Sequence, residues 1–124
     1  MTTPELIQLA DLVRTHQAEF QTIEVKAAHQ GCPHKLYDTL SSFSNQDEGG
    51  TILFGLDEKT GFAPVGIYDA QDLQKQVTEQ CNQMEPPVRA FFTIAEYTGV
   101  TICSAEIPAV DYAERPCYYK GKGR

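Results

Sequence analysis

The chain has 124 residues, of which 41% are apolar and 22% charged, and its formal net charge at pH 7 is −7. This length and composition predict one globular domain in the cytoplasm, because no apolar run approaches the roughly 20 residues of a membrane span and no basic segment precedes an apolar one as in a secretory signal. The acidic balance argues against a protein that coats nucleic acid by bulk electrostatics.

Apolar residues at helical spacing predict three helices. The first begins at Thr3, whose hydroxyl would cap it, and runs to about Thr15. Pro33 is placed to open the second helix, which ends near Asn45. Asp69 caps the third, and a pair of prolines after residue 85 stops it.

Strand patterns alternate with these helices. Residues 23–27 alternate with a period of two, which is typical of a half-buried strand. The run 51–56 is apolar on both faces, which predicts a central strand covered on two sides. The other predicted strands cover residues 61–67, 88–97, 100–107 and 115–120. This order predicts an α+β domain with one mixed β-sheet packed by about three helices.

Two glycines, Gly49 and Gly50, stand immediately before the central strand. They predict a tight turn with backbone angles closed to other residues and with uncovered main-chain amides. The alternative is a phosphate cradle, but such glycines usually open a helix, and here they open a strand. No Gly-x-x-x-x-Gly-Lys-Ser/Thr motif occurs, so ATP is not supported as a ligand.

Three carboxylates could meet at one end of the sheet if the strands 23–27 and 51–56 are neighbours. These are Glu19, Glu24 and Asp57. Such a cluster can hold a hard divalent cation and activate water. The alternative is that Glu24 pairs with Lys26 on the same strand face, Asp57 makes a turn, and Glu19 is solvated.

The four cysteines, at positions 32, 81, 103 and 117, are scattered, so we expect reduced thiols in the core. His29, Cys32 and His34 are three potential zinc ligands within six residues. Their spacing matches no familiar zinc pattern, so zinc is not expected.

The C-terminal end is basic, whereas the rest of the chain is acidic. Residues 115–124 hold four of the ten Lys and Arg residues and none of the 17 acidic ones. This end could touch phosphate through charged and aromatic side chains: Arg115, Tyr119, Lys120, Lys122 and Arg124. The alternative is a solubilising tail or a strand rim.

Four blocks of the sequence, in order, resemble the Schlafen AlbA_2 domain. The blocks are Glu19-x-x-x-x-Glu24-Val25-Lys26, the helix end at 40–45, the glycine-led strand at 49–57 and Arg115-Pro-Cys-Tyr-Tyr-Lys-Gly at 115–121. The resemblance implies residues 19–124 as an AlbA_2-like domain, with residues 1–18 as a helical extension. Because the chain stops at Gly-Lys-Gly-Arg without an apolar closure, we expect further domains to follow it.

The resemblance implies a non-catalytic, cofactor-free N-terminal domain of a bacterial transcriptional regulator, binding DNA rather than RNA. Candidate nucleic-acid contacts are Lys26 and the C-terminal residues named above, including Tyr119. The loop of Asn45, Gly49 and Gly50 is a separate candidate site. In animal Schlafens the related fold is a ribonuclease, so the alternative is a magnesium or manganese site at the three carboxylates. A second alternative is a protein-interaction or ligand-sensing module.

The sequence departs from the family pattern in two places. Val25 stands where the family most often has phenylalanine. The loop before Gly49 is one residue longer than usual and carries Asp47 and Glu48, which would repel phosphate. We therefore expect downstream domains or a homodimer to supply part of the basic surface.

Overall fold

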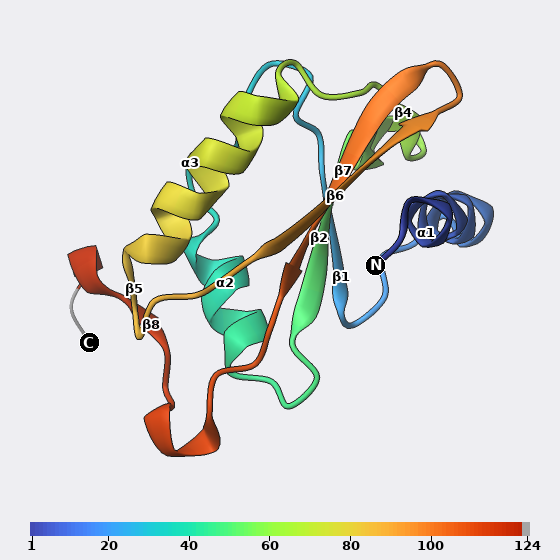
Figure 1. The fold of residues 1–124 in the computed structure, drawn as a ribbon. Coiled ribbons are helices and arrows are strands. Elements are labelled where there is room, and N and C mark those ends of the chain that lie inside the picture. Colours follow the sequence, from blue (N-terminus) through green and yellow to red (C-terminus); the bar gives the residue numbers. More distant parts are fainter. Residues whose placement is uncertain (123–124) are drawn as a thin grey trace.

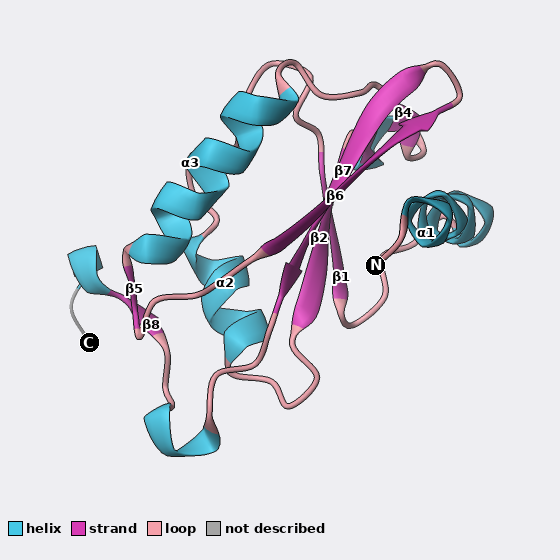
Figure 2. Ribbon diagram, in the orientation of Figure 1, coloured by secondary structure: helices cyan, strands magenta, loops and turns pink. Residues whose placement is uncertain are grey.

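The computed structural model describes residues 1–122 as three helices, a mixed four-stranded sheet and two small two-stranded sheets (Figures 1 and 2). The helices are α1 (Thr3–His16), α2 (Tyr37–Ser44) and α3 (Ala70–Asn82). The strands are β1 (Ile23–Lys26), β2 (Gly50–Phe54), β3 (Leu56–Asp57), β4 (Ala63–Pro64), β5 (Met84–Glu85), β6 (Phe91–Tyr97), β7 (Val100–Ile107) and β8 (Tyr118–Tyr119). No helix in this range is long and apolar enough to cross a membrane.

The main sheet has the strand order β1-β2-β7-β6. β1 runs parallel to β2, whereas β7 is antiparallel to both β2 and β6. The condition for a meeting of the three carboxylates, that β1 and β2 are neighbours, is therefore met, and the α+β class is confirmed. β2 lies inside the sheet, as its apolar residues on both faces indicate.

Two cores form because both faces of the sheet are covered. α2 and α3 lie on one face and α1 on the other (Figure 1). Ile52 and Phe54 of β2 point into the α2–α3 core, whereas Leu53 points into the α1 core with Leu6, and all four side chains are fully buried. Burying apolar side chains on both faces removes the sheet from water and supplies the main stabilisation.

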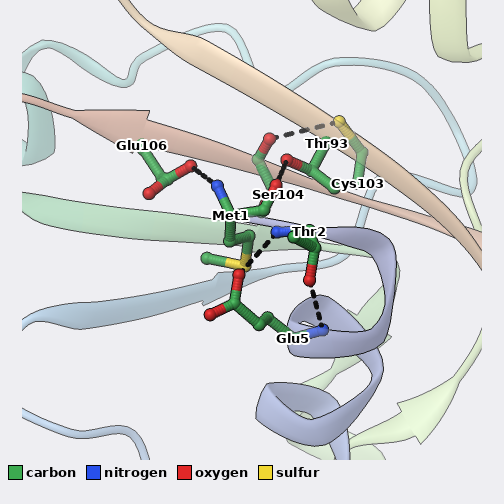
Figure 3. A network of polar contacts seen from close by, with 7 residues as sticks. All are labelled: Met1, Thr2, Glu5, Thr93, Cys103, Ser104 and Glu106. Carbon is green, nitrogen blue, oxygen red and sulfur yellow. Dashed lines mark hydrogen bonds and ion pairs between the residues drawn. The ribbon is translucent and has the colours of Figure 1, made fainter.

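The first helix is anchored by its own N-terminus (Figure 3). Thr2, and not Thr3 as predicted, is the capping residue: its hydroxyl accepts from the Glu5 amide at 3.2 Å, and the Glu5 carboxylate accepts from the Thr2 amide at 2.7 Å. The Met1 amino group contacts Glu106 of β7, and Thr93 of β6 donates to the Met1 carbonyl at 2.9 Å. These contacts tie α1 to the sheet.

The second helix and the last strand differ from their predictions. α2 begins at Tyr37, four residues after Pro33, because the Leu36 amide is held by the Gln80 side chain of α3 at 2.9 Å in a non-helical segment. β8 does not join the main sheet but pairs with β5. The predicted return strand is reduced to β4, which fits the proline within it.

The central strand is shorter than predicted because Gly55 breaks it. This residue has φ +115°, and a Cβ there would lie 2.8 Å from Ile102 of β7. Its amide still donates to Lys26 of β1 at 3.0 Å, so the chain stays against the sheet while it turns into β3. The kink delivers Asp57 and the following turn beside the α1–β1 connection, where Gln17 donates to the Gly61 carbonyl at 2.9 Å.

Candidate nucleic-acid interface

The C-terminal segment is clamped to the end of α2 by the side chains of Asn45 and of Ser41, whose hydroxyl donates to the Cys117 carbonyl at 2.9 Å. Asn45, the C-cap of α2, accepts from the Cys117 amide at 2.7 Å and donates to the Cys117 carbonyl at 2.9 Å. Its amide nitrogen also donates to the Ser41 carbonyl at 2.8 Å. The side chain thus replaces a strand neighbour for Cys117, which explains why an asparagine stands where this helix ends.

Arg115 is held inside the same junction. Its guanidinium donates to the carbonyls of Val110 and Asn45, both at 3.2 Å, and to the Asp47 carboxylate at 2.9 Å. It also lies 5.1 Å from the centre of the Tyr112 ring. Only 16% of the Arg115 side chain is exposed. In this arrangement it organises the loop, so it offers little of its charge to a ligand.

Beyond the clamp, the chain places an aromatic pair on the surface. The rings of Tyr37, at the start of α2, and Tyr119, in β8, are stacked with centroids 3.6 Å apart and planes at 15°. The Tyr37 hydroxyl donates to the Gln83 side chain at 3.1 Å, and the Lys120 amide donates to the Gln83 carbonyl at 3.0 Å. Figure 1 shows α2, β5 and β8 together on this side of the molecule.

A pocket of about 210 Å³ opens beside this stack, lined by Lys35, Tyr37, Asp38 and Tyr119. Lys35 and Lys120 are exposed, whereas both tyrosines are half-buried. We call this surface, made of the four lining residues and Lys120, the Tyr37–Tyr119 face. It combines aromatic rings with two cations, which is the combination used to bind single-stranded nucleic acid.

The predicted acidic residues lie near the β1 edge of the sheet, where α1 is connected to β1, and only some of them interact. Glu19 accepts from the Val25 amide of β1 at 2.6 Å. Burial raises the pKa of its carboxyl, and the charges of Glu24 and Glu58 raise it further, against the opposing effect of the Val25 hydrogen bond. Glu24 pairs with Lys26 at 3.4 Å, as one of the two interpretations predicted.

Asp57 is engaged in the turn that follows β3. Its carboxylate accepts from the Lys59 amide at 3.2 Å and caps a short 3₁₀ helix, Glu58–Thr60. Its backbone carbonyl accepts from the Thr60 hydroxyl at 3.3 Å. Asp57 therefore has the turn role that the second interpretation assigned to it, and Glu58 is the acid of this turn that interacts with Glu19.

As arranged here, these carboxylates do not fit a metal ion. Residues 1–122 contain no group of three or more His, Cys, Asp or Glu side chains that could hold one. Two of the three predicted ligands already accept backbone amides. The three potential zinc ligands also differ in solvent exposure. Cys32 is buried, and burial raises the pKa of its thiol to about 11, whereas His29 and His34 are exposed.

The glycine loop is filled by protein atoms. Gly49 has φ +66°, as the turn prediction requires, but its amide donates to the Gln46 carbonyl at 3.1 Å, so the expectation of uncovered amides is wrong there. A Cβ at Gly49 would collide with the Ile107 carbonyl oxygen, and one at Gly50 with the Phe43 ring. Both glycines are needed for close packing.

Sequence reasoning missed Lys35, Tyr37 and Glu58. Tyr37 and Tyr119 are far apart in the sequence, and nothing local to either residue indicates the stack. Glu58 stands beside a predicted ligand, but the turn that aims it at Glu19 depends on the kink at Gly55. Lys122 is described only as part of a short 3₁₀ helix, and Arg124 lies outside the described residues.

The fold and these motifs define a small α+β domain of the AlbA-like kind. The family model "Schlafen, AlbA_2" matches residues 19–124, and the chain belongs to this family. The resemblance carried by the four sequence blocks is thereby confirmed. A comparison with curated proteins found no match.

Two solved structures share the fold. One is the N-terminal domain of a RecG-related protein from Nitrosomonas europaea, with a TM-score of 0.77, 22% identity, and coverage of 96% of this chain and 82% of that chain. The other is the DIP2311 protein from Corynebacterium diphtheriae, with a TM-score of 0.51 and 13% identity. The match covers 94% of this chain but only 31% of that one. At such identities the likeness shows the fold alone.

Proposed function

We propose that this domain binds nucleic acid, DNA before RNA, as a non-catalytic N-terminal module of a bacterial transcriptional regulator in the cytoplasm. The observation that carries the proposal is the Tyr37–Tyr119 face, where the one basic stretch of an acidic chain meets a stacked aromatic pair. The family match supports it, and so does the structural neighbour's relation to a DNA helicase. Downstream domains or a second copy would add further basic surface.

The face can bind a phosphate backbone only weakly by itself, because the rest of the chain repels it. Lys35 and Lys120 provide two exposed cations, and the sequence adds Lys122 and Arg124. Lys26 is paired with Glu24, and Arg115 with Asp47, so their charges are partly neutralised. Binding should therefore depend on a few contacts and weaken steeply as salt rises.

Neutralising the basic end tests the proposal. In the triple variant Lys120→Gln, Lys122→Gln, Arg124→Gln we expect weaker binding to a labelled DNA strand and a shallower salt dependence. Each lost phosphate contact should reduce the slope of log K against log salt by about 0.7–0.9. Fluorescence anisotropy over a salt series measures both quantities.

The matched control removes three charges elsewhere, with Lys59→Gln, Lys75→Gln and Arg89→Gln, all exposed positions. It has the same net charge as the test variant, so it separates local contacts from the overall field. If both variants lose affinity equally, the overall charge of the protein carries the binding and this face has no special part in it. If neither changes, the proposal is wrong.

A metal-dependent ribonuclease is the second candidate, because Glu19 lies within electrostatic range of Glu24 and Glu58. The arrangement of the three carboxylates opposes it, since the Asp57 carboxylate caps a turn. We expect no saturable heat when Mn²⁺ is titrated into the wild-type domain or into Glu24→Gln/Asp57→Asn. Saturable binding by the wild type alone would place the function with the ribonucleases, and cleavage of structured RNA would then be the assay.

A further inference from the structure

We propose that the pocket beside Tyr37 and Tyr119 receives one unpaired nucleobase, so that the module prefers single-stranded over duplex nucleic acid. This inference rests on the proposed function and names the form of nucleic acid that the Tyr37–Tyr119 face takes. It is carried by three features of that face: a preformed aromatic stack, a pocket of matching size, and the placement of charge around it.

The stack is held in place before any ligand arrives. Tyr37 belongs to α2 and Tyr119 to β8, and β8 is paired with β5. Gln83 joins the two sides, since it accepts from the Tyr37 hydroxyl through its side chain and from the Lys120 amide through its carbonyl. Rings that are already ordered lose little conformational entropy on binding, so a base that contacts a ring in the pocket wall does so at low entropic cost.

The size and lining of the pocket suit a single base. Its volume of about 210 Å³ is below the roughly 300–1,000 Å³ of pockets that enclose drug-sized ligands. Every base has a π-face that can stack on an aromatic side chain. In a duplex both faces of each base are covered by neighbouring bases, so only an unpaired or extruded base can enter.

The charges place the base inside and the backbone outside. Asp38 lines the pocket, and the negative charge of its carboxylate disfavours a phosphate there. Lys35 also lines the pocket, and Lys120 follows Tyr119, so an exposed cation stands near each aromatic residue. A strand can therefore insert its base while its phosphates contact the lysines at the rim.

The test compares one oligonucleotide as a single strand and as a duplex, with Tyr37→Leu and Tyr119→Leu beside the wild type. Removing a stacking ring is expected to weaken single-strand binding roughly 5- to 150-fold and to leave duplex binding unchanged. Tyr37→Phe and Tyr119→Phe keep the rings and should bind nearly as the wild type. Tyr68→Leu removes a tyrosine that is 78% exposed elsewhere and should have no effect.

A second readout does not depend on the variants folding. A 2-aminopurine base in the single strand changes fluorescence when it leaves its neighbours and stacks on another ring, and the wild type should produce this change. A free mononucleotide should bind far more weakly, because it lacks the neighbouring phosphates.

The outcomes separate the two proposals. Salt-dependent binding that is equal for single strand and duplex, without a 2-aminopurine change, overturns the base pocket and leaves nucleic-acid binding in place. Tight binding of the mononucleotide alone would make the pocket a nucleotide site and overturn the strand preference. Absence of all binding overturns the proposed function itself.

Discussion

Replacing Asn45 by leucine is expected to lower the free energy of unfolding by about 1–3 kcal/mol, because it leaves the amide of Cys117 without its partner. A partly buried polar group that loses its only protein partner costs about 1–3 kcal/mol, whereas the Cys117 carbonyl still accepts from the Ser41 hydroxyl at 2.9 Å. The Ser41 carbonyl also loses a donor. Urea unfolding followed by tyrosine fluorescence measures the change, since the chain has six tyrosines and no tryptophan.

Gln46→Leu is the matched control, because it removes a second amide side chain at the same helix end. The Gln46 side-chain amide donates to the Ser42 hydroxyl at 3.1 Å in an exposed hydrogen bond. We expect its effect on unfolding to stay within about 0.5 kcal/mol. An Asn45→Leu variant as stable as this control would show that the clamp does not hold the C-terminal segment.

The same substitution should also weaken nucleic-acid binding. Cys117 lies two residues before Tyr119, so the clamp positions the strand that completes the aromatic stack. A loss of single-strand affinity in Asn45→Leu, measured where the protein is still folded, would indicate that Asn45 acts through the geometry of the Tyr37–Tyr119 face. Asn45 is then a positioning residue for this face.

The sequence predicts the sheet better than the site because different forces determine them. The apolar residues of β2 and β7 are enough to predict that these strands are buried, and local turn residues join β6 to β7. The start of α2 could not be found this way, because it depends on Gln80 of another helix holding the Leu36 amide. Side-chain contacts of this kind link residues that are distant in the sequence.

The candidate site shows the same limit residue by residue. Glu19 and Glu24 do interact, as their spacing suggested, but Glu58 replaces Asp57 as the nearby acid because the chain kinks at Gly55. Arg115 was expected to meet phosphate from its charge alone. Its three hydrogen-bond partners show that the donors of a cation near the surface can be occupied by acceptors of the protein itself.

Replacing Gly49 by alanine should lower the free energy of unfolding by about 2–5 kcal/mol, as the sum of two effects. A left-handed backbone costs a non-glycine residue about 1–2 kcal/mol. Crowding into packed structure adds about 1–3 kcal/mol. The second cost applies here because the new Cβ would meet the Ile107 carbonyl oxygen and lie 3.2 Å from the Ala109 amide nitrogen. Both are main-chain atoms, which cannot rotate away.

Gly99→Ala separates these two effects. Gly99 also has a positive φ, +86°, but a Cβ there would meet no atom within 4 Å. Only the backbone cost of about 1–2 kcal/mol should remain. Urea unfolding of the two variants therefore measures the close approach of the Gly49 loop to the end of β7. Equal losses would mean that the loop can move away from β7, and the loop would then regain the freedom that a ligand-contacting role requires. A larger loss at Gly49 would instead support its role as a packing element beneath the clamped C-terminal segment.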